Sequence, residues 1–372
     1  MSEPLSSKDG TPAASAPMVE LRSVSKQYGA AAALSEIDLT VAKGEFVTLL
    51  GPSGSGKTTL LNIIAGMAQP TSGQVVIDGR DATHLAPSER GLGMVFQNYA
   101  LMPHMTVFDN IAFPLRVRKM ARAQIEQKVH DVLKLIRLPD IAQRRPRELS
   151  GGQQQRVSLA RCIVYNPSLI LLDEPLGALD KKLREQMQLE IKRIHSELGI
   201  TMLNVTHDQD EALTLSDRIV LMNGGRIEQQ CAPADLYFRP RTVFAADFMG
   251  EANLFPATLR AIDGDTVRLD SPVGELQAMR PDFLAGEGAG FTVLVRPENV
   301  TMSTSAAPGA NVVRGTLRDS IVLSGVVKHY VSLAGREVIV QEANHARRRT
   351  HLPGHEVFLT WNWRDALVLP AQ

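Results

Sequence analysis

A glycine-rich run, Gly51-Pro52-Ser53-Gly54-Ser55-Gly56-Lys57-Thr58, separates an apolar stretch from a stretch of helical pattern. The apolar stretch, Phe46-Val47-Thr48-Leu49-Leu50, is typical of a buried parallel strand. Glycines let the backbone wrap around a phosphate, so that the N–H groups of the loop and of the following helix face the anion. The run therefore predicts a nucleotide-binding loop between a strand and a helix.

The side chains of this run have distinct predicted roles. Lys57 is expected to reach the β- and γ-phosphates of the nucleotide, and Thr58 to offer its hydroxyl group to Mg²⁺. A glycine-rich loop can match the pattern by accident, but its position between a strand and a helix favours binding. The residues predicted to contact the nucleotide here are Gly51, Pro52, Ser53, Gly54, Ser55, Gly56, Lys57, Thr58 and Thr59.

Two acidic residues, Asp173 and Glu174, follow the buried-strand pattern Leu169-Ile170-Leu171-Leu172. Acids after a strand are often no more than a solvated strand end. In a chain that also carries a phosphate-binding loop, Asp173 can hold Mg²⁺ through water, and Glu174 can polarise the attacking water as a general base. We therefore predict a hydrolytic site at this strand end.

A second helix start follows the sequence Leu149-Ser150-Gly151-Gly152-Gln153. A serine before a helix can be a simple N-cap. The same arrangement is also a ready anion site, because the N–H groups of the first turn point outward along the helix axis. One chain would then carry one phosphate loop and a second phosphate-binding helix start, which could serve the nucleotide of another copy.

The pattern of strands and helices divides the chain into two predicted domains. Strands and helices alternate from Val19 to about Pro240, which predicts an α/β domain. From about Glu251 onward, short β-like runs lie between Gly, Pro and Asp residues, which predicts a small barrel-like β domain. The expected boundaries are a disordered leader at 1–17, the α/β domain at 18–240, a linker at 241–250 and the β-rich domain at 251–372.

Composition excludes several classes of function. Lysine plus arginine and aspartate plus glutamate both number 40, so there is no basic field to hold a nucleic acid. The two cysteines lie far apart, which argues against a disulfide scaffold and suits a reducing cytosol. No apolar run approaches the ~18–20 residues that cross a bilayer, so any membrane function would depend on partner subunits.

In order and spacing, these motifs resemble those of ABC transporter ATPases. The resemblance is carried by Gly51 to Thr58, Gln97, Leu149 to Gln153, Asp173-Glu174 and His207, and it covers Val19 to Pro240 without a gap. The Leu-Ser-Gly-Gly-Gln sequence is specific to that superfamily. The resemblance implies an α/β P-loop NTPase fold with a helical signature subdomain, which hydrolyses ATP with Mg²⁺.

The resemblance also implies roles for single residues. Gln97 is similar to the Q-loop glutamine that senses Mg²⁺, the attacking water and the membrane partner, and His207 to the switch histidine that contacts the γ-phosphate. Asp180 is similar to the aspartate that couples two sites, and Tyr28 lies where the family stacks an aromatic ring on adenine. The signature residues that would cap the ATP of the opposite subunit are Ser150, Gly151, Gly152 and Gln153.

The C-terminal region resembles the TOBE domain, an OB-like module found in the ATPases of binding-protein-dependent importers. Leu294-Val295-Arg296-Pro297-Glu298 is a recurring marker of that domain. The segments Ser324-Gly325 to Gly335-Arg336, Asn344 and Val357 to Trp361 look most like the spermidine/putrescine branch. The resemblance therefore implies polyamine uptake, with iron, sulfate and sugar as the alternative solutes, because their importers share most of this pattern.

Together these resemblances imply a set of partners. We expect a head-to-tail dimer with a second copy of the chain, two transmembrane permease subunits at the cytoplasmic face of the inner membrane, and indirectly a periplasmic or surface solute-binding protein. No nucleic-acid partner is expected. Three alternatives are an ABC ATPase of DNA repair or translation, a nucleotide-binding regulatory module and an exporter. The sequence has no coiled-coil insertion, which argues against a role in DNA repair or translation. Lys57, Glu174 and His207 are intact, which argues against a purely regulatory module, and the TOBE-like region argues against an exporter.

Overall fold

The computed structural model describes residues 17–177, 179–283, 289–305, 311–345 and 352–371. The chain forms two compact units, Met1–Pro233 and Ala234–Gln372. Apart from Pro17, the leader predicted at 1–17 lies outside the described residues.

The first unit is built around a six-stranded sheet with the strand order β10-β9-β3-β8-β7-β6. Strands β6, β7, β8, β3 and β9 run parallel, and β10 pairs antiparallel with β9. All five residues of β3 are buried, as the apolar run predicted. The strands are β3 (Phe46–Leu50), β6 (Gly93–Val95), β7 (Leu169–Asp173), β8 (Thr201–Thr206), β9 (Arg218–Asn223) and β10 (Arg226–Cys231).

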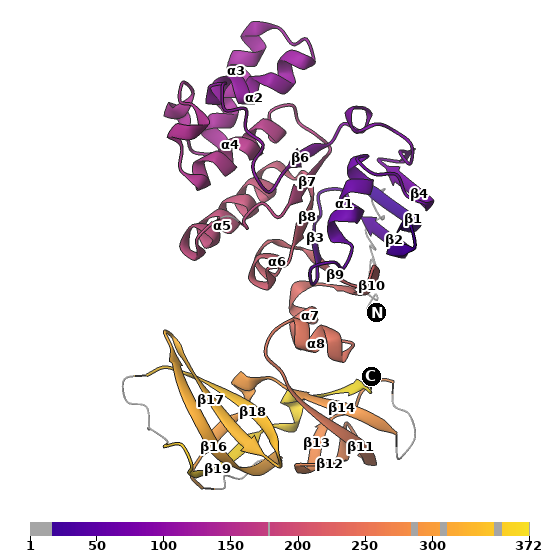
Figure 1. The fold of residues 1–372 in the computed structure, drawn as a ribbon, viewed down its shortest axis with the longest axis vertical. Coiled ribbons are helices and arrows are strands. Elements are labelled where there is room, and N and C mark those ends of the chain that lie inside the picture. The colour runs from indigo at the N-terminus through magenta and orange to yellow at the C-terminus, as the bar shows by residue number, and fades with distance from the viewer. Residues whose placement is uncertain (1–16, 178, 284–288, 306–310, 346–351, 372) are drawn as a thin grey trace, which may run out of the picture. The chain divides into compact units, whose positions relative to one another are not determined.

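Helix α1 (Lys57–Ala65) is enclosed between this sheet and a second, antiparallel sheet (Figure 1). The second sheet has the order β2-β1-β4-β5. Its strands are β1 (Val19–Tyr28), β2 (Ala31–Val41), β4 (Ser72–Ile77) and β5 (Arg80–Asp81). Leu60, Leu61, Ile63 and Ile64 of α1 are fully buried in the core that both sheets share. The helix that follows the glycine-rich loop is therefore packed firmly in place.

The other face of the six-stranded sheet packs against a helical part. Its helices are α2 (Val107–Val117), α3 (Arg122–Leu135), α4 (Gly151–Ile163), α5 (Lys181–Leu198) and, beside β8, α6 (Gln209–Leu215). Helices α2, α3 and α4 gather beyond β6 and β7 (Figure 1). They share one hydrophobic core with α5 and with Phe46, Ile170 and Met202 of the sheet. This part confirms the helical subdomain, and α5 spans the residues predicted from its apolar spacing.

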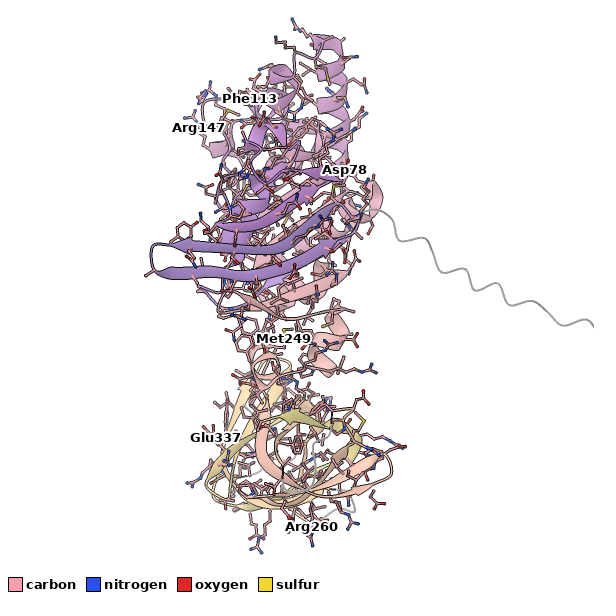
Figure 2. The ribbon with its side chains drawn as sticks, turned by 90° about the vertical axis from the view of Figure 1, so that its right-hand side faces the viewer. Asp78, Phe113, Arg147, Met249, Arg260 and Glu337 are labelled. Carbon is pink, nitrogen blue, oxygen red and sulfur yellow. The ribbon has the colours of Figure 1, made fainter. Side chains whose placement is uncertain are left out.

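The second unit contains two five-stranded antiparallel sheets around one core. One sheet holds β11 (Asn253–Asp263), β12 (Thr266–Ser271), β13 (Gly274–Met279), β14 (Gly290–Val295) and β20 (Ala366–Pro370). The other holds β15 (Thr301–Ser303), β16 (Asn311–Leu323), β17 (Val326–Leu333), β18 (Arg336–Ala343) and β19 (Glu356–Trp361). The strands curve around their buried side chains, whereas the labelled Arg260 and Glu337 are exposed (Figure 2). The β-rich, barrel-like expectation is thus realised as two curved sheets.

Two short helices occupy the region predicted to be the domain end and the linker. Helix α7 is Pro233–Phe238 and helix α8 is Val243–Phe248. The buried guanidinium group of Arg296 donates to the carbonyl groups of Tyr237, Ala246, Gly250 and Glu251. Its Cζ atom also lies 4.5 Å from the centre of the Tyr237 ring. Residues 234–250 therefore belong to the second unit, and the segment expected to be a linker at 241–250 contains helix α8.

We predict that residues 18–233 bind ATP without the second unit. All of the predicted phosphate-binding residues precede Pro233, and the first unit has its own hydrophobic cores. A chain ending at Gly250 should unfold at a lower temperature than the 18–233 fragment, because it keeps the carbonyl groups that Arg296 binds but loses Arg296 itself. Calorimetric ATP titration and thermal unfolding of both fragments check this. A folded 18–233 fragment that binds no ATP would contradict the division.

Candidate functional site

The loop between β3 and α1 has a backbone that only glycine fits. Gly54 and Gly56 have φ angles of +81° and +99°, in the left-handed region. A Cβ atom at Gly56 would lie 2.7 Å from both the carbonyl oxygen of Ala33 and a methyl carbon of Leu34. Gly56 is also the N-cap of α1 and supplies no capping side chain, so the first-turn N–H groups face the loop without a side-chain acceptor. This is a backbone cradle for an anion.

Lys57 lies at the base of this cradle. Its side chain is almost fully buried, and Nζ donates to the carbonyl oxygens of Gly51 and Pro52, both at 2.8 Å. Burial lowers the pKa of the Lys57 amine, and the negative charge of Glu174 opposes that shift. Among the described residues, no carboxylate pairs with this ammonium group at ion-pair distance. A phosphate would supply the missing negative charge, so the residues present fit the predicted ligand.

The structure brings Gln97, Glu174 and His207 together. The Glu174 carboxylate has Oε1 at 3.1 Å from His207 Nδ1, and Oε2 accepts from Gln97 Nε2 at 3.3 Å. The Glu174 backbone N–H donates to the carbonyl of Val205 on β8. The three side chains predicted to carry the chemistry therefore meet at the carboxyl ends of neighbouring parallel strands, where α/β sheets place their sites.

Glu174 has a strained backbone. Its φ angle is +44°, in the left-handed region that a residue with a Cβ atom seldom adopts. Such a conformation costs about 1–3 kcal/mol and persists where the surrounding structure over-determines it, often at functional sites. No feature of the sequence predicts this strain, and the carboxylate of the same residue contacts both His207 and Gln97.

Asp173 is half-buried at the end of β7, next to Glu174. Burial raises the pKa of its carboxyl group, and the charge of Glu174 raises it further. Two adjacent acids in this setting fit a cation. Within the described residues no group of three or more acids, histidines or cysteines could form a complete metal site. In proteins, one or two carboxylates together with the phosphates of a nucleotide commonly hold Mg²⁺. Asp173, Thr58 and Gln97 remain the predicted metal residues.

The signature segment starts helix α4. Ser150 is the N-cap, and it exchanges two hydrogen bonds with Gln153, at 3.0 and 3.4 Å. A Cβ atom at Gly152 would lie 2.9 Å from Leu183 of α5, so this glycine permits close helix packing. Helices α4 and α1 lie in different parts of the first unit (Figure 1). Among the described residues, no hydrogen bond joins Ser150 to the loop of its own chain.

Two further predicted residues lie outside the cluster around Glu174. Asp180 is the N-cap of α5, where its Oδ1 atom accepts from the N–H of Leu183 at 3.0 Å. Tyr28 ends β1 with 56% of its surface exposed, and Lys26 Nζ lies 4.9 Å from its ring centre. An exposed ring of this kind is free to stack on a base, and the adenine role of Tyr28 stays a prediction.

Sequence reasoning missed a hydrogen-bond network behind His207. The buried Glu211 carboxylate accepts from Asn204 Nδ2 at 2.8 Å and Thr206 Oγ1 at 3.1 Å. Burial raises the pKa of Glu211 to about 7, against the lowering effect of these two hydrogen bonds. Asp208 caps α6 by accepting from the Glu211 N–H at 2.9 Å. A capping residue followed three positions later by Glu was the available signal.

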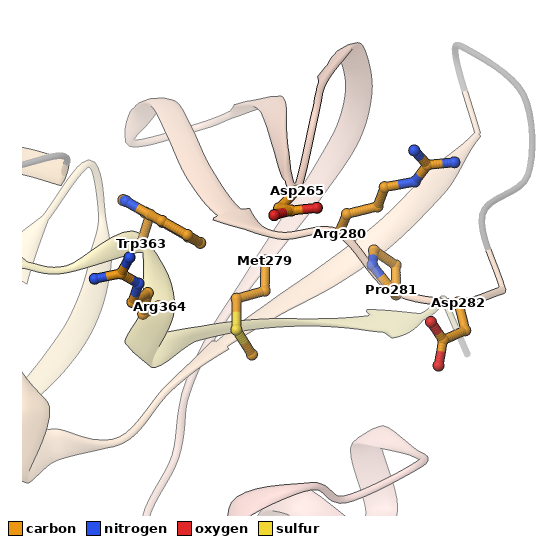
Figure 3. A pocket seen from close by; sticks show the side chains of 7 residues that line it. All are labelled: Asp265, Met279, Arg280, Pro281, Asp282, Trp363 and Arg364. Carbon is orange, nitrogen blue, oxygen red and sulfur yellow. The ribbon is translucent and has the colours of Figure 1, made fainter. Parts of the chain in front are cut away.

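The second unit contains an open cavity of about 770 Å³ (Figure 3). Its lining residues are Asp265, Met279, Arg280, Pro281, Asp282, Trp363 and Arg364. None of them belongs to a phosphate motif. The candidate nucleotide site therefore lies in the first unit, where the phosphate-binding loop is, and not at this cavity.

Both parts of the chain match known protein families. Residues 34–177 match the ABC transporter family, and residues 293–369 match the TOBE domain. A spermidine/putrescine import ATP-binding protein of Pseudomonas aeruginosa is 44% identical, with 93% of this chain and 97% of that protein covered. The protein of that name in Thermobifida fusca is 45% identical, with 95% and 94% covered.

A solved structure resembles the first unit. It is the dimeric post-hydrolysis state of an ATP-binding cassette bound to ADP and Pi, with 36% identity and a TM-score of 0.52. The alignment covers 58% of this chain and 99% of the solved one. Within the described parts of the chain, no helix has both the length and the apolar character needed to cross a membrane.

Proposed function

Because this chain belongs to the ABC transporter ATP-binding proteins that carry a TOBE domain, we propose that its ATP hydrolysis drives polyamine import through separate permease subunits. The observation that carries the choice of solute is the near full-length similarity to relatives named for spermidine and putrescine import. The C-terminal segments that resemble the same branch support it. Iron, sulfate and sugar are the alternative solutes, and a cassette that works without a membrane is the alternative function.

The site residues act on ATP in the following way. Lys57 and the N–H groups at the start of α1 bind the β- and γ-phosphates. Thr58, Asp173 and Gln97 are the residues that would hold Mg²⁺, and the ion would neutralise phosphate charge. Glu174 takes the proton of the attacking water, and His207 contacts the γ-phosphate. The contacts of Glu174 with His207 and Gln97 support this division of roles.

Each ATP lies between two copies of the chain in this proposal. The P-loop of one copy faces Ser150, Gly151, Gly152 and Gln153 of the other, with Asp180 between the two sites. The separation of α4 from α1 within one chain supports this head-to-tail arrangement, and so does the dimeric state of the solved cassette. ATP would favour the closed pair because it gains contacts from both copies only in that state.

The permease subunits contact the segment from Tyr99 to Phe113, which follows Gln97. Hydrogen bonds tie the start of this segment to α4: Ser158 Oγ donates to the Tyr99 carbonyl, and Arg161 donates to the carbonyls of Tyr99 and Ala100. Phe113 at the end of the segment is 42% exposed. A push on this segment would therefore reach the signature helix. The complex would lie at the cytoplasmic face of the inner membrane, with a solute-binding protein outside and no nucleic acid.

We predict that cells lacking this chain lose uptake of radiolabelled spermidine and putrescine, and that the wild-type chain restores it. Lys57→Ala should not restore uptake, because phosphate binding depends on this lysine. Lys134→Ala, exposed on α3, is the matched control and should restore it. Loss of sulfate, iron or sugar uptake with normal polyamine uptake would favour an alternative solute. No effect on any uptake would favour a role outside transport.

A further inference from the structure

Arg184 of α5 joins two loops that flank the candidate site. One guanidinium nitrogen, Nη2, donates to the carbonyl of Leu179 at 3.1 Å. The other, Nη1, donates to Oδ2 of Asp208 at 2.8 Å, and this pair is partly shielded from solvent. Leu179 lies in the loop before α5, and Asp208 follows His207 in the chain. A single planar side chain therefore holds both loops by two directed hydrogen bonds.

The loop of Leu179 also touches the start of α4. A Cβ atom placed on Gly151 would lie 3.3 Å from a methyl carbon of Leu179. The signature segment therefore lies against Leu179, whose carbonyl group binds Arg184, so a movement of this segment can reach Arg184 through the Leu179 loop.

The turn around His207 is fixed on both sides. Before it, Thr206 Oγ1 donates to the buried Glu211 carboxylate and accepts from the Asp208 N–H at 3.0 Å. After it, Asp208 uses Oδ1 to cap α6 and Oδ2 to bind Arg184. The exposed His207 ring itself has its contact with Glu174 at 3.1 Å. Its direction depends on the turn, and Arg184 is the member of this network that comes from another helix.

We propose that Arg184 is a positioning residue that, through Asp208, holds His207 toward Glu174 and ties this geometry to the Leu179 loop. The inference rests on the proposed hydrolysis at Glu174. The pair itself is partly exposed and contributes little to folding stability. Its effect lies in geometry, because small displacements of catalytic groups cost large factors in rate.

The test compares Arg184 with Arg193, a matched control on the same helix. Arg193 also donates to a loop carbonyl, that of Leu135, and to the carboxylates of Glu190 and Glu197. It does not contact the turn that holds His207. We expect Arg184→Gln to lower kcat about tenfold with little change in KM for ATP. Arg184→Lys, which keeps the charge but not the two-point fork, should give an intermediate loss. Arg193→Gln should leave kcat within about twofold.

Two readouts separate positioning from a general structural effect. In a His207→Ala background, Arg184→Gln should cost no further rate, because its route to the chemistry is already removed. In ¹⁵N-histidine NMR of the ATP-free protein, Arg184→Gln should shift the ring signal that His207→Ala removes, and Arg193→Gln should not. An unshifted His207 signal overturns the proposal. Equal losses in both backgrounds also overturn it. An inactive wild-type chain would count against the proposed function, while the NMR signal still decides the role of Arg184.

Discussion

Ser150→Arg should lower ATP hydrolysis at least about 10²-fold while the chain's own P-loop still binds ATP. Ser150 caps α4 and, in the proposed dimer, faces the γ-phosphate bound to the other copy. An arginine there fills the space and replaces the hydroxyl group that would face the phosphate. The loop at Gly51–Thr58 is untouched, so binding measured on the single chain should persist. Ser150→Ala removes the hydroxyl group and the cap, which costs about 1 kcal/mol of stability, without filling the space, so it is the control for the bulk and charge of the arginine.

Mixing this variant with Lys57→Ala chains tests the arrangement across the dimer. A mixed pair contains one site with an intact P-loop and an intact signature, and one site with both halves damaged. Partial hydrolysis should therefore return on mixing two inactive proteins. The matched control mixes Ser150→Arg with the double variant Ser150→Arg/Lys57→Ala, in which no intact site can form. Mixtures that stay inactive despite mixed pairs, detected by differential tags, would contradict the head-to-tail arrangement.

The parts of the fold that could be predicted are those with strong local patterns. The apolar run at Phe46–Leu50 predicts β3 because a buried parallel strand needs apolar residues on both faces. The 18 residues of α5 repeat their apolar positions often enough to define both ends. Helices α7 and α8 have six residues each, too few for a helical period to show. They depend on Arg296, which is distant in the sequence and binds their carbonyl groups.

The candidate site also has features that the sequence predicts and features that only the folded chain shows. Gln97, Glu174 and His207 could be expected to meet, because each follows or belongs to a recognisable motif near a strand end. The positive φ of Glu174 depends on the surrounding structure and leaves no mark in its own residue type. The bridge from Leu179 through Arg184 to Asp208 requires α5 to pack beside the turn before α6, which only the folded chain shows.

Glu174→Gln should slow ATP hydrolysis at least about 10²-fold, which is the loss expected when a general base is removed. The amide keeps the shape of the side chain and can still hydrogen-bond to water, but it cannot accept the proton. The strained backbone should be preserved, since glutamine and glutamate have the same branching at Cβ. The substitution also removes a negative charge near the γ-phosphate, so ATP should stay bound and the ATP-bound dimer should accumulate.

Phosphate release and ATP-dependent light scattering measure the two effects of this substitution separately. Glu185→Gln, an exposed carboxylate on α5, removes the same charge outside the site and should change turnover by no more than about twofold. Near-normal turnover in Glu174→Gln would move the base elsewhere, with His207 the next candidate because its Nδ1 atom lies 3.1 Å from Glu174. Loss of ATP binding would instead make Glu174 a structural residue. Slow turnover with a persistent dimer is the result that distinguishes a lost proton acceptor from both.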